Sequence, residues 1–191
     1  MKKILVAAIL LLGCISASAQ NFGIGGGFLN TSTVIEESSS SLNGGYVQAT
    51  ADLNFASNFA VVAGLRYVYA GGNKGIDLPF FGKTSSHTIG VPVFAKMNVF
   101  NNGDLKAFFF AGPTLYYGLS LKSQSGELVS NWYKNEVFKP LNITMGAGIG
   151  LDAMEAVRFT VGYDYGLTKR YNSSNTKSHS GDIRFGVAFL F

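Results

Sequence analysis

The sequence is poor in cysteine, proline and charge. Its 191 residues include one cysteine and four prolines, and charged residues make up 14%, against about 25% in an average soluble protein. One cysteine cannot build a disulfide framework, and so few charges argue against a disordered chain or a nucleic-acid partner. Glycine and aromatic residues are abundant instead, with 24 glycines and 16 phenylalanines. The length fits one domain that is apolar, aromatic and rich in glycine.

The first 19 residues have the pattern of a secretory signal peptide. Lys2 and Lys3 give it a positive start, residues 4–12 are apolar, and Ala17-Ser18-Ala19 matches a small-residue cleavage site. The apolar stretch is shorter than the ~20 residues that a membrane-spanning helix needs. We predict cleavage at this site, so that residues 20–191 form the mature domain.

Cys14 leaves one alternative open. The residues before it, Leu11-Leu12-Gly13, resemble a lipobox, in which Cys14 would be lipidated and become the new N-terminus. Ordinary cleavage instead removes this cysteine, so the mature chain has no thiol for catalysis or metal binding. It also removes two lysines and lowers the formal net charge of +4 by two. A net charge this small does not indicate any particular class of binding partner.

Apolar residues recur at every second position of the mature chain, which is the period of a β-strand. In the last segment Ile183, Phe185 and Val187 alternate with Arg184 and Gly186. One face of this segment is therefore apolar, and the other is small or charged. Eight segments show the pattern: residues 22–30, 47–55, 59–69, 89–99, 105–121, 141–151, 157–167 and 183–191.

The connections between these segments alternate in length. Tight turns are expected at residues 56–58, 100–104 and 152–156, and longer polar loops at residues 31–43, 70–82, 122–137 and 169–181. Outer-membrane barrels are built this way, with short periplasmic turns, long external loops, an even number of strands and both termini in the periplasm.

The polarity of the second face separates a membrane barrel from a soluble sandwich or a lipocalin-like barrel, whose apolar face would point inward. Charges cannot line a dry core, but they can fill a lumen inside a lipid-facing belt. We therefore predict an all-β fold: an eight-stranded antiparallel up-and-down transmembrane β-barrel in the cell outer membrane. Lys139 lies on the apolar face, but at a loop end, where it can reach lipid headgroups. The predicted lumen charge network comprises Asp52, Arg66, Lys96, Lys106, Arg158, Asp164 and Arg184.

Aromatic residues lie near both ends of the predicted strands, as in the two girdles of membrane barrels. The short turns have Phe55, Phe59, Phe159, Phe189 and Phe191 nearby, and the long loops have Tyr67, Tyr69, Tyr117, Phe138 and Tyr165. The chain ends on Phe191, and a C-terminal aromatic residue on an alternating strand resembles the insertion signal of outer-membrane barrels.

Five short segments resemble the PorT-like outer-membrane β-barrel family of Bacteroidota. They are Val91-Pro92-Val93-Phe94-Ala95-Lys96, Phe110-Ala111-Gly112-Pro113, Gly146-Ala147-Gly148-Ile149-Gly150-Leu151, Tyr163-Asp164-Tyr165-Gly166-Leu167 and Phe189-Leu190-Phe191. Together they span most of the mature chain, and each is mainly structural. The resemblance implies an eight-stranded barrel in the outer membrane. Some relatives serve a secretion apparatus, but no residue in these segments carries that role by itself.

Two motifs suggest catalysis at first sight. The repeat Gly146-x-Gly148-x-Gly150 lacks the following helix and the acidic ribose partner of a nucleotide site, so we interpret it as small residues that make room in a narrow lumen. His87 and His179, each beside serines, suggest a lipid-modifying enzyme. His87 opens the fourth strand and His179 precedes the eighth, which places them about half a circumference apart, and neither has an acid partner in its own strand. We therefore predict no catalytic residue, no cofactor and no metal site.

The expected external loops carry charged and aromatic residues. Glu36 and Glu37 precede a serine run in the first loop. The residues expected to make loop contacts are Trp132, Tyr133, Lys169, Arg170 and Lys177. They could touch lipopolysaccharide phosphates or a partner protein, and the alternative is an ordinary solvated loop surface.

These patterns predict a monomeric barrel with a structural or loop-mediated interaction role in the envelope. An open porin-like channel is disfavoured, because eight strands enclose little more than their own inward side chains. An accessory role in envelope assembly or protein secretion is the first alternative, and a lipid-modifying enzyme is the second.

Two details of the barrel are also predicted. Pro92 and Pro113 lie almost opposite each other on neighbouring strands, and neither has an N–H, so the ladder should break there. Asp164 and Arg184 lie at similar heights on the inward face of adjacent strands, so they should pair, while Asp52, Asp152 and Asp182 serve the other basic residues.

Overall fold

The computed structural model describes residues 21–35, 38–72, 83–125, 128–131, 139–168 and 178–191. In these residues the chain forms nine β-strands: β1 (Asn21–Ile35), β2 (Ser38–Ala56), β3 (Phe59–Gly72), β4 (Lys83–Asn101), β5 (Leu105–Ser125), β6 (Leu128–Asn131), β7 (Leu141–Ala153), β8 (Val157–Gly166) and β9 (Ser178–Leu190). No helix in this described part of the chain is long and apolar enough to cross a membrane.

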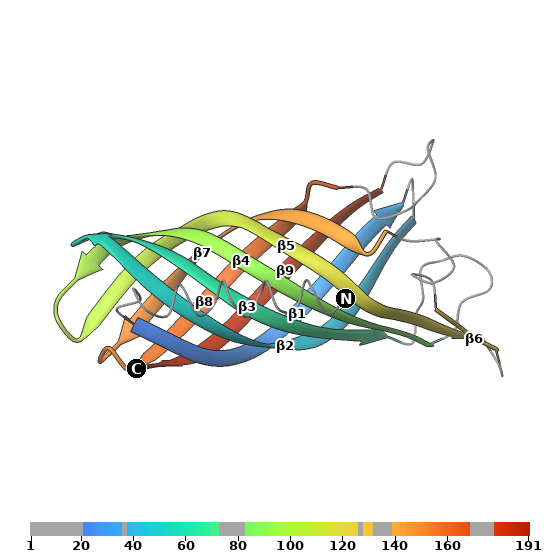
Figure 1. The fold of residues 1–191 in the computed structure, drawn as a ribbon, viewed down its shortest axis with the longest axis horizontal. Coiled ribbons are helices and arrows are strands. Elements are labelled where there is room, and N and C mark those ends of the chain that lie inside the picture. The colour runs from blue at the N-terminus through green and yellow to red at the C-terminus, as the bar shows by residue number, and fades with distance from the viewer. Residues whose placement is uncertain (1–20, 36–37, 73–82, 126–127, 132–138, 169–177) are drawn as a thin grey trace, which may run out of the picture.

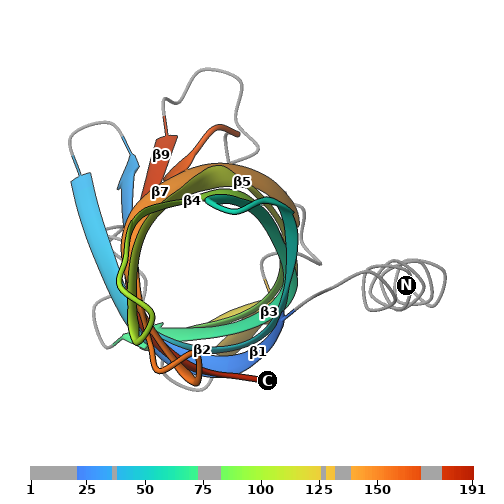
Figure 2. The ribbon, with the colours of Figure 1, turned by 90° about the vertical axis from the view of Figure 1, so that its left-hand side faces the viewer.

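Eight of the nine described strands form a closed antiparallel barrel (Figures 1 and 2). Around the ring, β1 pairs with β2, β2 with β3, β3 with β4, and β4 with β5. The ring continues with β5 paired to β7, β7 to β8, and β8 to β9. The pairing of β1 with β9 closes the ring. The short β6 pairs with residues 122–125 of β5, outside the ring of eight. The predicted up-and-down topology with eight wall strands is confirmed.

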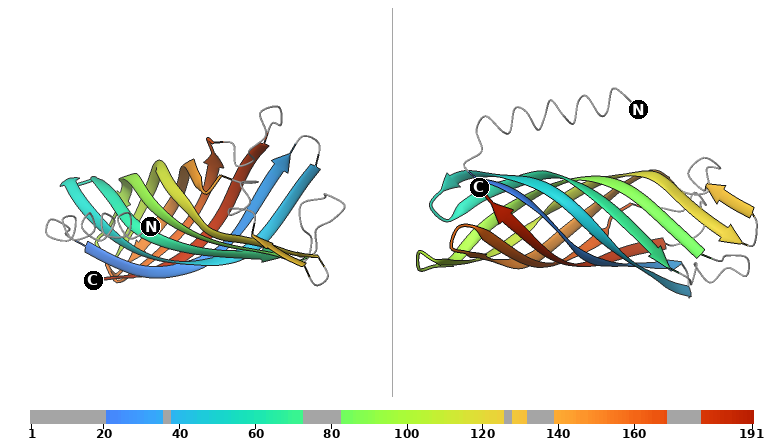
Figure 3. Two further views of the ribbon diagram at one scale, coloured as in Figure 1. Left: turned by 45° about the vertical axis from the view of Figure 1, so that its right-hand side comes forward. Right: turned by 90° about the horizontal axis from the view of Figure 1, so that it is seen from below.

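The three tight turns and the chain terminus lie at one end of the barrel, which we call the turn end, and the other is the loop end (Figure 3). The turns join β2 to β3, β4 to β5 and β7 to β8, as predicted. The last residue is held by two backbone hydrogen bonds, in which Phe22 N donates to the Phe191 carbonyl and Phe191 N donates to the Phe22 carbonyl. The final aromatic residue is thus part of the closing seam.

The predicted long loops at residues 31–43 and 122–137 were too long, because strands extend into both ranges. β1 and β2 stay paired from Asn30↔Asn43 to Ile35↔Ser38, and β5 continues to Ser125. The sequence there is mostly polar, as in residues 31–33 of β1, 38–41 of β2 and 122–125 of β5, so these strand ends lack a continuous apolar side. Without a lipid-facing side the alternation that marks a membrane strand disappears, although the backbone pairing continues.

Side chains alternate between a lipid-facing surface and the lumen, as predicted. In β7, exposed and buried residues follow each other from Leu141 onward. Polarity runs opposite to that of a soluble protein: Asp164 is 0% exposed and Arg66 1%, whereas Ile24 is 61% exposed. The outward apolar surface is the lipid belt.

The prolines interrupt the ladder where predicted. Between β4 and β5 the pairing runs through Pro92↔Thr114 and resumes at Ala95↔Ala111, with no register shift between them. Between β3 and β4 the pairing also stops after Ala63↔Val93 and resumes at Arg66↔Gly90. Because a proline nitrogen cannot donate, each proline removes ladder bonds on one side of its own strand.

Candidate functional site

The lumen holds two groups of buried charges. The turn-end cluster consists of Asp52 on β2, Lys96 on β4, Asp152 on β7 and Arg158 on β8. Arg158 Nη2 lies 2.7 Å from Asp52 Oδ2, and Arg158 Nε lies 2.7 Å from Asp152 Oδ1. Lys96 Nζ lies 3.2 Å from Asp52 Oδ2 and 2.7 Å from Asp152 Oδ2. Two carboxylates and two cations balance, which is the condition for burying such charges.

This cluster spans the width of the barrel. In the strand order, β2 and β7 lie on opposite walls, and Asp52 and Asp152 are the carboxylates of those walls. The same two cations bridge both carboxylates. The cluster is therefore a cross-brace through the lumen.

The loop-end cluster is centred on Asp164 of β8. Arg184 Nη2 of β9 donates to Asp164 Oδ1 at 2.6 Å, so the predicted pair is present. Arg66 Nη1 of β3, from the opposite wall, lies 3.7 Å from Asp164 Oδ2. Arg66 also donates to Gln48 Oε1 at 3.1 and 2.9 Å and to the Tyr116 hydroxyl at 2.9 Å. This second brace is held by neutral hydrogen-bond partners as well as by charge.

Phenylalanines separate the two clusters. Phe94 and Phe110 have ring centroids 5.2 Å apart, and those of Phe108 and Phe110 are 6.3 Å apart. Lys96 Nζ lies 4.4 Å from the centroid of the Phe108 ring, and the Arg184 guanidinium lies 5.7 Å from that of Phe94. The cations rest on ring faces, where the quadrupole attracts them. From the turn end to the loop end, the lumen therefore holds the turn-end cluster, the layer of phenylalanine rings and the loop-end cluster.

The glycines of β7 make room for these side chains. A Cβ at Gly150 would lie 2.2 Å from Phe108 Cζ, and one at Gly148 would lie 2.4 Å from Phe110 Cζ. The structure therefore accounts for the Gly146-x-Gly148-x-Gly150 repeat by packing inside a narrow barrel, as its sequence context suggested.

Lys106 lies beside Lys96 and Asp152 at the turn-end mouth of the lumen, but its ion pair is with a residue outside the predicted network. Its Nζ pairs with Glu155 Oε1, and its side chain is 27% exposed at the turn end. Strand parity alone suggested an inward direction, but a flexible chain so near the end of β5 reaches the adjacent turn. The other six predicted network residues are buried.

Neutral members of the network were missed by sequence reasoning. Gln48 and Tyr116 complete the partners of Arg66, and their inward parity was the only available signal. Among the predicted loop contacts, Trp132, Tyr133, Lys169, Arg170 and Lys177 lie outside the described residues, as do Glu36 and Glu37.

The two histidines lie on opposite walls, β4 and β9, as expected. His87 Nδ1 lies 2.6 Å from the Tyr67 hydroxyl, and the His179 side chain is outside the described part of the structure. Over the described residues, no group of three or more His, Cys, Asp or Glu side chains could hold a metal ion.

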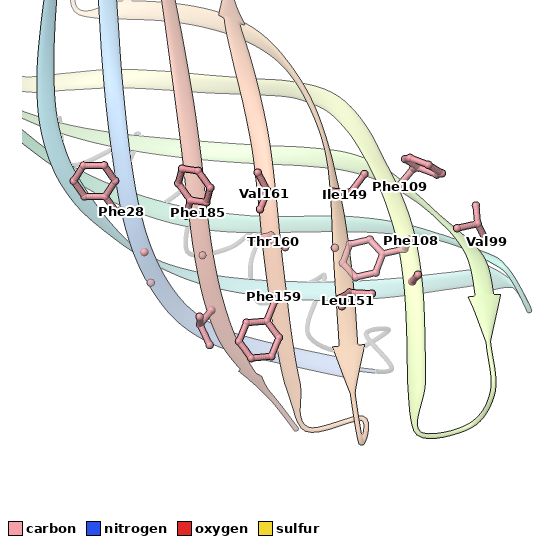
Figure 4. Close-up of a pocket in the computed structure, with 16 residues that line it drawn as sticks. Phe28, Val99, Phe108, Phe109, Ile149, Leu151, Phe159, Thr160, Val161 and Phe185 are labelled. Atoms are coloured by element: carbon pink, nitrogen blue, oxygen red, sulfur yellow. The ribbon is translucent and has the colours of Figure 1, made fainter.

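A shallow apolar groove of about 650 Å³ follows the outer wall (Figure 4). One border is a register row of Phe28, Phe185, Val161, Ile149 and Phe109. The next row toward the turn end includes Phe159 and Leu151. Because the groove lies within the lipid belt, it is a surface for acyl chains of the bilayer.

Comparison with known proteins agrees with this geometry. The chain matches the family described as outer membrane protein beta-barrel domain over residues 17–172. Neisserial surface protein A has a similar structure, with 16% identity and a TM-score of 0.59 over 89% of this chain and 97% of that chain. The attachment invasion locus protein of Yersinia pestis is 10% identical, with a TM-score of 0.55 over 90% and 98%. No curated protein matches. At these identities the solved structures establish the fold alone.

Proposed function

We propose that this chain, which belongs to the outer membrane protein beta-barrel domain family, is a closed monomeric barrel that presents its external loops to another protein of the cell envelope. Its place is the outer membrane. The barrel wall is the anchor in this function, and the loops carry the interaction. No cofactor and no catalytic step are part of the proposal.

The observation that supports this role is the double brace across the lumen. Arg158 joins carboxylates on opposite walls, and Arg66 extends from β3 to Asp164 on β8. Moving Arg158 aside would leave two buried carboxylates to share Lys96, and moving Arg66 aside would take its buried charge away from Asp164 and Tyr116. Breaking a buried charge network in this way costs several kcal/mol. A steady solute pathway through the described barrel is therefore unfavourable, and the exposed ends are left to carry function.

Two measurements test the proposal. In planar bilayers the purified protein should give no steady ion current, whereas a sustained ohmic current would contradict a closed lumen. In cells, a variant lacking residues 123–138 should still insert and show heat-modifiable migration but lose cross-linking to its envelope partner. A variant that keeps the same cross-linked partner would refute a role for this loop.

An accessory role in envelope assembly or protein secretion is the alternative, and it rests on the resemblance to PorT-like barrels. The same loop-deletion strain separates the two functions. Secretion should fail in that strain if the accessory role is correct, and should continue if the loops bind a partner of another kind.

A lipid-modifying activity is the weaker alternative. It would need a nucleophile or base near a histidine, and the hydrogen bond of His87 goes to Tyr67. Activity against lipid A or phospholipid that is lost in both His87→Ala and His179→Ala would replace the present proposal.

A further inference from the structure

We propose that the outer wall at the loop end binds the phosphate groups of a phosphorylated glycolipid in the outer leaflet. The site, which we call the rim patch, consists of Tyr67 and Tyr69 on β3, His87 on β4, Lys122 on β5 and Lys139 just before β7. It lies on the lipid-facing side of the barrel and is independent of the proposed loop interaction.

The aromatic part of the rim patch is preorganised. The Tyr67 hydroxyl is 2.6 Å from His87 Nδ1, and the ring centroids of Tyr69 and His87 are 5.1 Å apart. When the tyrosine donates to Nδ1, the ring proton resides on Nε2. His87 then offers an N–H donor on the side away from Tyr67, suited to a phosphate oxygen.

Strand register brings the lysines to the same surface. A register shift next to His87 places Ser120 opposite it, and Lys122 lies opposite Ser85. Lys122 is exposed and is a diagonal neighbour of His87, at about 7–8 Å between backbones.

Lys139 borders the same stretch of β5. Gly118 N donates to the Pro140 carbonyl at 2.7 Å, which holds the residue before Pro140 against the loop-end part of β5. Lys139 is exposed, and its place on the lipid-facing parity was predicted to bring it to the headgroup level.

In the described residues of these strands, no carboxylate competes for the two cations on the lipid-facing side. Within the described parts of β3, β4, β5 and β7, the only acidic residue is Asp152, which is buried in the turn-end cluster. Lys122 and Lys139 therefore have no acidic neighbour on the lipid-facing surface of these four strands. A surface that is cationic, exposed and aromatic at the membrane boundary complements an anionic headgroup.

The rim patch lies at the membrane boundary and faces outward, and both features favour a lipid as its ligand. Tyr67 and Tyr69 are exposed on the outward face, where amphipathic rings mark the headgroup zone. β3, β4 and β5 lie side by side as far as the loop end (Figure 1). A ligand here must have an anionic head beside the lysines and an apolar part against the belt below, as a phosphorylated glycolipid has.

The test measures binding of diphosphoryl lipid A to the full mature barrel in detergent by native mass spectrometry. We expect wild type to prefer it over the dephosphorylated lipid. Lys122→Gln combined with Lys139→Gln should weaken binding about 25-fold, since each lysine near such a surface contributes about fivefold. The matched control, Lys106→Gln, removes a lysine at the opposite end and should bind like wild type.

Three results would overturn the proposal: equal wild-type affinity for the phosphorylated and dephosphorylated lipids, unchanged affinity in the double variant, or full displacement of the lipid by equimolar inorganic phosphate. The first and third need only wild type, so they decide the matter even if the double variant does not fold. Heat-modifiable migration verifies folding of each variant.

Discussion

Asp164 is the carboxylate on which both arginines of the loop-end cluster converge. We expect Asp164→Asn to lower the free energy of unfolding by about 3–5 kcal/mol, because it leaves buried cations without their charge partner. Arg184→Gln should cost less, since Arg66 stays near Asp164. In a double-mutant cycle, measured by denaturant unfolding in lipid vesicles, the two losses should fall short of additivity. Simple additivity would mean that the pair contributes no coupling.

Met154 sits in a strained turn. It has φ 53 and Glu155 has φ 54, in the left-handed region, which costs about 1–2 kcal/mol for ordinary residues. Asparagine tolerates this region, and Met154 is exposed, so Met154→Asn should raise the free energy of unfolding by up to about 1 kcal/mol. Ser57→Asn, at a turn residue without positive φ, is the control and should change little. A gain no larger than the control's would rule out relief of strain.

Lys106 and Glu155 form an ion pair at the exposed turn end. The hydrogen bond from Lys106 holds the pKa of the Glu155 carboxyl below its ordinary value. A lowered folded-state pKa adds stability above the unfolded pKa, about 4.3, and that stability is lost as the pH falls through the folded value. The stability difference between wild type and Lys106→Ala should therefore be small at pH 7 and disappear in acid. A difference that grows on acidification would contradict this assignment.

The ladder between β4 and β5 has a gap where Pro92 and Pro113 meet. The register is unchanged on either side of the gap between β4 and β5, so a residue with an N–H at position 113 could complete the ladder. We expect Pro113→Val to raise the free energy of unfolding by about 0.5–1.5 kcal/mol, the usual net value of one hydrogen bond. Pro140→Val, just outside the strands, is the matched control. Equal effects of the two variants would show that the missing donor is not what limits pairing.

The barrel as a whole depends on the brace between its opposite walls. Arg158→Met should lower the temperature at which the compact band of unboiled samples converts to the unfolded band in a gel. Removing one partner from a buried charge network costs about 3–5 kcal/mol in stability. Lys106→Met removes the same charge at the exposed end and should shift this temperature little. Similar shifts in both variants would mean that the brace does not hold the walls together.

Much of the architecture could be read from particular residues. The alternation ending at Phe191 located a strand and its lipid-facing side, and the same reasoning assigned Asp52, Arg66 and Arg158 to the interior. Parity gave the side of the strand for Lys106, but it could not show that this long side chain pairs with Glu155 of the adjacent turn. Gln48 and Tyr116 escaped notice because a neutral partner leaves no charge pattern.

The sequence by itself determined which side of each strand faces lipid. Side chains alternate with period two, and charged side chains on the lipid-facing side would be destabilising. It also determined the number of wall strands and the closing order, since short turns join neighbours. Only the tertiary structure decided which lumen charges meet. Closure and stagger of the strands set the heights of residues far apart in the chain, so that Arg158 reaches Asp52 across the barrel and Lys96 joins the same carboxylate from β4.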